Sequence, residues 1–126
     1  NELTAIGRGD WPAITQIVFR NYQWGAEKRN TTLWYQDNFV GTELNYEVSY
    51  AGIAEACNLK GVVARTMEDL TAALNQAIKD QMENGVTTLI EAMINQELGE
   101  PFRRDAMTAP VAVAGIDAKD MRTQQV

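Results

Sequence analysis

The residues best placed to do chemistry lie in one run, from Thr15 to Gly25. An apolar, β-branched-rich stretch ends at Arg20-Asn21 and leads into the turn Tyr22-Gln23-Trp24-Gly25. The turn places the side-chain oxygen of Asn21 and several backbone carbonyls just past a strand's carboxyl end, where ligands bind in α/β sheets. Oxygen ligands of this kind suit a hard cation such as Mg²⁺, especially one that bridges to phosphate.

The residues around this turn also have simpler interpretations. Many strands end in an asparagine that serves only as a turn residue, so Asn21 stays open between a metal ligand and a turn former. The charged run Glu27-Lys28-Arg29 is typical of the solvated face of a helix.

The sequence contains no histidine. Imidazole general bases, Ser-His and Cys-His catalysis and histidine zinc sites are therefore excluded. Chemistry must depend on carboxylates, amides, backbone groups or a borrowed cofactor. The single cysteine, Cys57, excludes an internal disulfide and fits a reducing, cytoplasmic compartment. We expect Cys57 to be a small buried helix residue.

The composition indicates one globular domain of 126 residues, with 45% hydrophobic residues and a net charge of −6. This charge disfavours a nucleic-acid surface and a polybasic membrane anchor. No apolar run is long enough for a membrane span. We expect small-molecule ligands, with neither nucleic acid nor membrane as a partner.

Hydrophobic periodicity predicts alternating helices and strands. The expected helices are Glu2–Ile6, a short irregular one within Gln23–Tyr35, Tyr46–Cys57 and Met67–Met82; the expected strands are Thr15–Arg20, Leu59–Ala64 and Val86–Ile94. This order predicts an α/β fold with a mostly parallel sheet and helices on both faces. Asn21, Arg65 and Ile94-Asn95 would then lie near the carboxyl ends of strands.

Local signals refine these elements. Thr66-Met-Glu-Asp69 resembles a capping box, Asn84-Gly85 ends the long helix, and Asn58 ends the helix before it. The first strand reads as buried on both faces. Glu91 lies in an apolar strand, so we expect it to pair across a subunit contact or to lie at an exposed edge. The predicted apolar helix faces are Tyr46, Tyr50, Ile53, Ala54 and Cys57, and Leu70, Ala73, Leu74, Ala77 and Ile78.

Two segments resemble the thiamine-diphosphate-dependent enzymes. Asn1-Glu2-Leu3, a strand and Arg20-Asn21-Tyr22-Gln23 are similar to the second half of their fingerprint, which begins with Gly-Asp-Gly and ends in Asn-Asn. Arg20 replaces the first asparagine and Asn21 keeps the second, while the Gly-Asp-Gly would fall upstream of Asn1. Ile53 to Gly61 resembles a recurring segment of the same domain. The resemblance implies an N-terminally truncated thiamine-diphosphate-binding fold in residues 1–115, with a polar tail in 116–126.

The resemblance also implies a site. The Asn21 side-chain oxygen and the Gln23 backbone carbonyl would bind Mg²⁺, with the missing aspartate as third ligand, and the metal would hold the diphosphate of thiamine diphosphate. Tyr22, Trp24 and Gly25 would complete the cofactor-binding run, although Tyr22 and Trp24 could equally be core or interface anchors. Arg20 could contact an anion or another domain, although an edge ion pair is favoured. No catalytic residue is expected in this chain, since the activating glutamate belongs to another domain in this superfamily.

Longer runs resemble superfamily members that transfer an acetyl group from sulfoacetaldehyde to phosphate. The resemblance implies an oligomeric enzyme of which this chain alone is not catalytic. An acetolactate-type carboligase, a 2-oxo acid decarboxylase and a non-catalytic α/β interaction module stay open. Arg103 and Arg104 could bind an oxyanion or anchor the tail. The runs are Phe19–Asn30, Asp37–Thr42, Gln96–Asp105 and Pro110–Gly115.

Overall fold

The computed structural model describes residues 2–97, without the side chain of Leu33. Its elements are α1 (Glu2–Ile6), β1 (Thr15–Arg20), α2 (Gly25–Trp34), α3 (Tyr50–Ala56), β2 (Lys60–Ala64), α4 (Met67–Asn84) and β3 (Thr88–Met93). The predicted α/β order is confirmed. The expectations for Arg103, Arg104, Pro110–Gly115 and the tail 116–126 lie outside the described residues.

The three strands form one parallel sheet in the order β1-β3-β2. Arg20 lies opposite Met93, and Ala64 lies opposite Ala92. The carboxyl ends of the strands therefore meet at one edge of the sheet, as predicted. The backbone N–H of Ile94 extends this contact by donating to the Arg20 carbonyl at 3.0 Å.

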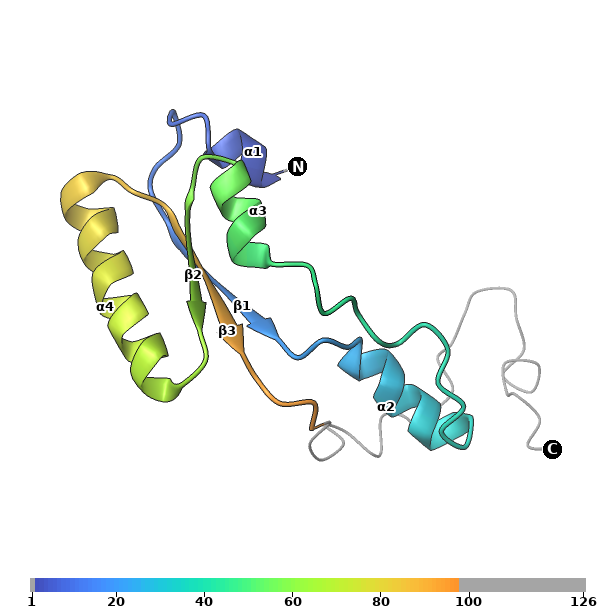
Figure 1. Ribbon diagram of the computed structural model, residues 1–126. Helices are drawn as coiled ribbons and strands as arrows, with labels where there is room; N and C mark the ends of the chain where they lie inside the picture. Colours follow the sequence, from blue (N-terminus) through green and yellow to red (C-terminus); the bar gives the residue numbers. More distant parts are fainter. Residues whose placement is uncertain (1, 98–126) are drawn as a thin grey trace, which may run out of the picture.

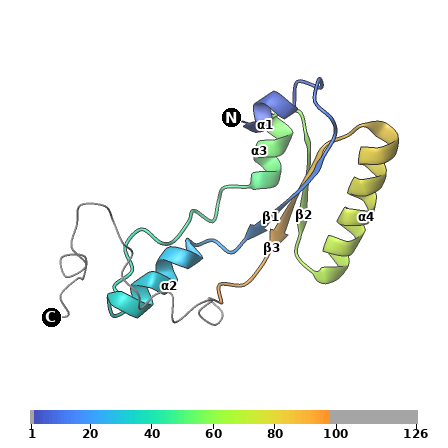
Figure 2. The same ribbon diagram turned by 180° about the vertical axis from the view of Figure 1, so that it is seen from behind.

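Helices cover both faces of this sheet, and the alternation of β2 shows which helix covers which face. The Lys60 side chain pairs with Asp80 of α4, whereas the next residue, Gly61, lies against Ala51 of α3. Because successive strand residues point to opposite faces, α4 and α3 lie on opposite sides. Both ribbon views agree, with α4 on one side of the strands and α1 and α3 on the other (Figures 1 and 2).

The hydrophobic core lies between α4 and the sheet. Ala64, Ala77 and Ile90 are its buried centre, and Leu70, Ala73 and Leu74 pack against them. The predicted apolar stripe of α4 is thus confirmed except at Ile78, which is exposed. The exception arises at the edge of the stripe, where the helix surface turns away from the strands.

The ends of α4 follow the predicted signals. The Thr66 side chain accepts from the Asp69 N–H, and the Asp69 carboxylate accepts from the Thr66 N–H, both at 3.0 Å. This reciprocal pair is a capping box. Gly85 ends the helix with φ 64°, a left-handed conformation that costs glycine little.

The helix α3 differs from the prediction. It begins at Tyr50 rather than Tyr46, because the Ser49 hydroxyl caps it by accepting from the Gly52 N–H at 3.1 Å. The predicted apolar face is wrong for Tyr46 and Ile53, which are exposed, while Ala51 and Ala54 are buried. Asn58 does end the helix in the left-handed conformation, with φ 63°. Cys57 is only partly buried.

The strand β1 is not buried on both faces within the described residues. It is an edge strand of the sheet, and Ile17 and Phe19 are 38% and 65% exposed. Both side chains lie on the face that α4 covers, since Thr15, two residues earlier, donates to Gln81 of α4 at 2.9 Å. The helix covers β3 and β2 but leaves the outer half of β1 open.

The helix α2 projects away from the sheet, beyond the carboxyl ends of β1 and β3 (Figure 1). The segment that joins it to α3 runs back beside it, and an antiparallel bridge pairs Gln23 with Glu43. No helix in the described part of the chain is long and apolar enough to cross a membrane.

Candidate functional site

The predicted site turn follows β1 directly. The Asn21 side-chain oxygen accepts a hydrogen bond from the Gln23 backbone N–H at 3.2 Å. Between them Tyr22 has φ 60°, in the left-handed region that a bulky residue rarely adopts. An unfavourable backbone conformation of this kind persists only where surrounding contacts hold it.

The bridge with Glu43 determines where the backbone groups of Gln23 point. The Trp24 N–H donates to the Thr42 carbonyl, and the Leu44 N–H donates to the Tyr22 carbonyl, both at 2.8 Å. These bonds flank Gln23, so Gln23 and Glu43 form a non-hydrogen-bonded pair. The Gln23 carbonyl therefore faces away from Glu43 and is not used by the bridge.

A pocket of about 240 Å³ opens at this turn. The helix α2 begins at the pocket, and its N-cap residue, Trp24, makes no side-chain capping hydrogen bond. The start of an α-helix presents backbone N–H groups and a partial positive charge, which favour phosphate oxygens. The pocket is lined by Asn21, Gln23, Gly25, Ala26, Arg29 and Glu97.

The pocket thus brings together three of the five predicted site residues. Asn21, Gln23 and Gly25 line it, whereas Tyr22 and Trp24 do not. The Tyr22 ring stacks on the Tyr46 ring with a centroid distance of 4.3 Å, and its hydroxyl contacts the Met93 sulfur at 3.9 Å. Trp24 is 54% exposed. Cofactor contacts of Tyr22 and Trp24 stay predictions.

Sequence reasoning missed Ala26, Arg29 and Glu97 as pocket residues. Arg29 lies one helical turn after Gly25, so the start of α2 and the helical period together could have indicated it. Glu97 had no local signal, because it reaches the pocket only through the parallel pairing of β1 and β3.

A polar network fixes the Gln23 side chain, which is 4% exposed. Its amide nitrogen donates to the Gln96 carbonyl at 2.8 Å, and its oxygen accepts from the Lys28 ammonium at 3.1 Å. Lys28 also pairs with Glu43, and this hydrogen bond lowers the pKa of the Glu43 carboxyl. Lys28 is thus largely buried, so the expectation of a solvated charged face is wrong for this residue.

Arg20 and Glu91 form a buried ion pair behind the turn. Arg20 is 7% exposed and Glu91 is fully buried. The favoured expectation of an ion pair for Arg20 is confirmed, although the pair is internal rather than at an edge. The expectation for Glu91, a subunit contact or an exposed edge, is wrong, because β3 is the central strand.

The Glu91 carboxylate is stabilised by several donors. Burial alone would raise its pKa, but hydrogen bonds from the Ala51 N–H at 3.0 Å, from Arg20 and from the Ser49 hydroxyl at 3.1 Å outweigh burial and lower the pKa. The carboxylate stays ionised and joins β3 to the start of α3.

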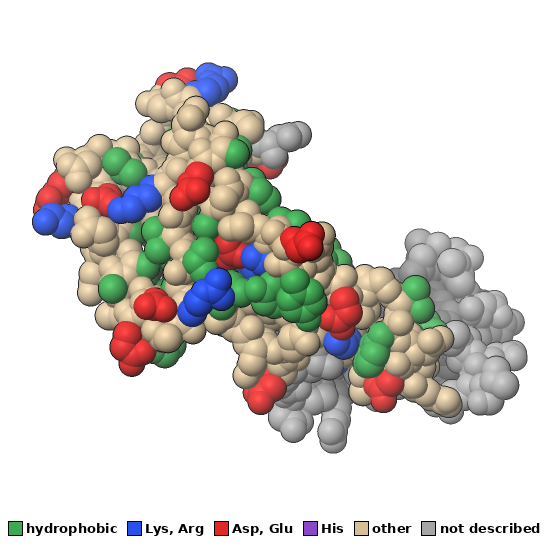
Figure 3. Space-filling view, viewed as in Figure 1, with side chains coloured by type: hydrophobic (Ala, Val, Ile, Leu, Met, Phe, Trp, Pro, Cys, Tyr) green, Lys and Arg blue, Asp and Glu red, His purple; other side chains and the backbone are tan. Residues whose placement is uncertain are grey.

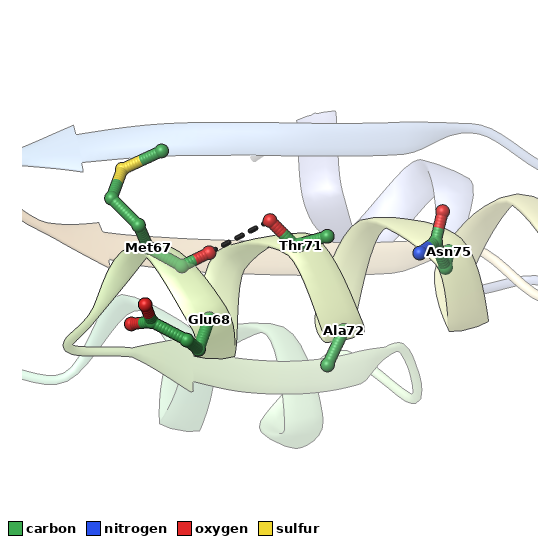
Figure 4. A pocket seen from close by; sticks show the side chains of 5 residues that line it. All are labelled: Met67, Glu68, Thr71, Ala72 and Asn75. Atoms are coloured by element: carbon green, nitrogen blue, oxygen red, sulfur yellow. Dashed lines mark hydrogen bonds between the residues drawn. The ribbon is translucent and has the colours of Figure 1, made fainter.

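Another depression within residues 2–97 has a different lining. A larger depression of about 460 Å³ lies on α4, and every lining residue comes from that helix (Figure 4). The hydrogen bond drawn there, from the Thr71 hydroxyl to the Met67 carbonyl at 2.8 Å, joins two residues of the same helix. On the face in Figure 3, acidic and basic side chains are scattered among hydrophobic ones rather than gathered into a patch of one sign.

The donor set at the turn fits a metal-bound diphosphate. It offers a neutral amide oxygen, a carbonyl that the bridge leaves available and the start of a helix, all at one pocket. Mg²⁺ takes few protein ligands and completes its coordination with phosphate oxygens and water. In residues 2–97 no group of three or more acidic, cysteine or histidine side chains is placed to hold a metal.

Comparison with known proteins shows the class. Residues 1–92 match the family described as thiamine pyrophosphate enzyme, C-terminal TPP binding domain, and the chain belongs to this family. Over its full length it is 80% identical to the sulfoacetaldehyde acetyltransferase of Roseovarius nubinhibens. It is 78% identical over 98% of its length to the Rhodobacter capsulatus enzyme of that name, and 49% identical over 88% to that of Castellaniella defragrans. The chain spans 21% of the first two relatives and 18% of the third.

Proposed function

We propose that this chain is the cofactor-binding part of an enzyme that converts sulfoacetaldehyde and phosphate to acetyl phosphate and sulfite. The observation that carries the proposal is the 80% identity to a sulfoacetaldehyde acetyltransferase along the whole chain. The pocket beside Asn21 and Gln23 supports it, since it offers the oxygen ligands that a magnesium-bound diphosphate requires.

In this proposal two oxygens of the turn hold Mg²⁺: the side-chain oxygen of Asn21 and the backbone carbonyl of Gln23. An amide oxygen has two lone pairs, so Asn21 can accept from the Gln23 N–H and bind the ion as well. Because asparagine is neutral, it adds no repulsion beside a diphosphate. Asn21 and Gln23 would hold the ion, while Gly25 and the first turn of α2 would offer backbone N–H groups to the phosphate oxygens.

Bound thiamine diphosphate would supply the electron sink for cleavage of the carbon–sulfur bond and for transfer of the acetyl group. The chain's own residues bind and orient the diphosphate end of the cofactor and hold the turn rigid. Tyr22 and Trp24 border this site, with Tyr22 packed behind the turn. The proposed enzyme is a cytoplasmic homo-oligomer that joins through its cofactor domains.

The test uses the full-length protein that contains this chain. Sulfoacetaldehyde is supplied with thiamine diphosphate, Mg²⁺ and phosphate, and acetyl phosphate is measured as its hydroxamate. We expect product only when all four are present, and omission of phosphate controls for simple cleavage. If no acetyl phosphate forms but pyruvate is converted to acetolactate or acetaldehyde, the enzyme is instead a carboligase or a decarboxylase. No binding of thiamine diphosphate at all would leave a non-catalytic module.

A further inference from the structure

We infer that Arg20 is a positioning residue for the metal-binding turn and sets the orientation of the Asn21 and Gln23 oxygens without contacting the ion. The inference rests on the proposed function, since it takes these two oxygens as magnesium ligands. Its basis is the set of contacts that the Arg20 side chain makes behind the turn.

The guanidinium of Arg20 joins three parts of the structure. One nitrogen pairs with Glu91 in the central strand, and another donates to the Tyr46 carbonyl at 3.0 Å. The carbon of the guanidinium lies 4.3 Å from the centre of the Tyr22 ring. A planar cation can donate at its edge and stack on its face at once, and lysine cannot reproduce this combination.

These contacts hold Tyr22 in its left-handed conformation. Its ring lies against the Arg20 guanidinium and also against the Tyr46 ring, with centroids 4.3 Å apart and planes inclined by 22°. Arg20 itself binds the Tyr46 backbone, so the two partners of the ring are fixed relative to each other. Loss of this packing would release Tyr22 toward the ordinary backbone regions.

The conformation of Tyr22 decides where the metal-binding oxygens lie. Asn21 precedes it and Gln23 follows it, and the hydrogen bond between them depends on the turn that Tyr22 makes. A change in the Tyr22 backbone would rotate the Gln23 carbonyl relative to the Asn21 side chain. Mg²⁺ demands near-octahedral geometry at short distances, whereas Ca²⁺ tolerates flexible and irregular sites.

Glu91 anchors Arg20 at the other end. Its second carboxylate oxygen accepts from the Ser49 hydroxyl and the Ala51 N–H, at 3.1 and 3.0 Å. The ion pair therefore connects the turn to the first turn of α3 and to the middle of β3. Arg20 is therefore anchored by residues that do not line the pocket.

The experiment compares Mg²⁺ with Ca²⁺ in the full-length protein. Each ion is titrated by calorimetry in the presence of thiamine diphosphate, for the wild type and for Arg20→Lys. We expect the dissociation constant for Mg²⁺ to rise about tenfold, as for other residues that support metal ligands. For Ca²⁺ we expect a rise of less than about threefold, since its coordination is flexible. The ratio of the two constants is a readout that a loss of stability alone does not move.

Two further variants keep the test decisive. Tyr46→Leu removes the ring that stacks on Tyr22, together with a hydroxyl that accepts from the Gln96 side chain. Because Tyr46 is exposed, we expect this variant to disturb folding less than Arg20→Lys does, and it should shift the ratio in the same direction. Lys60→Met breaks the ion pair with Asp80 at the opposite end of the sheet and should leave the ratio unchanged.

The outcomes distinguish failure of this inference from failure of the proposed function. If the ratio of the Mg²⁺ and Ca²⁺ dissociation constants stays at its wild-type value in Arg20→Lys and Tyr46→Leu, the positioning role is overturned. This includes the case in which both ions bind equally more weakly, and the proposed metal site then still stands. Wild-type protein that binds thiamine diphosphate without any divalent ion overturns the proposed metal site, and the inference with it.

Discussion

The Gln23 backbone N–H donates to the Asn21 side-chain oxygen at 3.2 Å, so the two residues proposed as magnesium ligands are joined directly. This bond orients the amide of Asn21, because its oxygen, and not its nitrogen, must face the N–H. The remaining lone pair of that oxygen is then available to an ion at the pocket.

Removal of the Asn21 oxygen should weaken metal binding. For Asn21→Ala we expect the magnesium dissociation constant, measured by calorimetry with thiamine diphosphate, to rise by at least about tenfold. Asn21→Asp keeps an oxygen ligand but places a negative charge beside the diphosphate, so the affinity for thiamine diphosphate should also fall. Asn75→Ala, on the exposed face of α4, is the matched control. Wild-type affinity in Asn21→Ala would exclude Asn21 as a ligand.

Loss of Glu91 should destabilise the fold. Glu91→Ala leaves the guanidinium of Arg20 buried without its carboxylate, which costs about 3–5 kcal/mol in comparable pairs. Replacement of both partners, in Arg20→Met with Glu91→Leu, should recover much of this loss, since buried pairs exchange for apolar residues at little cost. Urea unfolding of the full-length protein measures both. A double variant no more stable than the single one would contradict this account of the pair.

Gly61 should not tolerate a methyl group. A Cβ at this position would overlap the Ala51 carbonyl and lie 3.0 Å from the Ala51 Cα, so β2 and α3 would have to separate. We expect Gly61→Ala to cost about 1–3 kcal/mol in unfolding free energy. Gly52→Ala is the control, because its Cβ would meet only Ser49 at 3.5 Å and helix α3 should gain about 0.5–1 kcal/mol. Equal stability of the two variants would contradict the close packing of β2 and α3.

The Asp80 carboxylate should contribute to stability at neutral pH but not in strong acid. Hydrogen bonds from Lys60 and Gln76 hold its folded pKa below the ordinary value. In the unfolded chain the Asp80 carboxyl binds its proton at a higher pH, at about 3.9. Its contribution to stability therefore disappears as the pH falls from this value through the lower pKa of the folded state. Thermal unfolding of the full-length protein from pH 7 to pH 3 should show a shallower acid decline for Asp80→Asn. Asn75→Ala, on the exposed surface of the same helix, changes no titratable group and should decline as the wild type does.

The sequence predicted well those features that depend only on neighbouring residues, such as helix caps and strand ends. The capping box at Thr66, the left-handed ends at Asn58 and Gly85, and the strand that ends at Arg20 are all present. The prediction failed for α3 because a single cap, Ser49, shortened a helix whose periodicity extended further. It failed for β1 because burial depends on which element packs against the strand.

The sequence by itself determined the class of the chain and the kind of ligand to expect. A strand followed by Asn21 and a turn predicts oxygen ligands at a sheet edge, since residue type and order are local properties. The tertiary structure alone decided that Arg20 meets Glu91, 71 residues away. It also decided that Gln23 meets Gln96, 73 residues away. Such pairs depend on the strand order β1-β3-β2, which places distant residues side by side and which the pattern of a single strand does not contain.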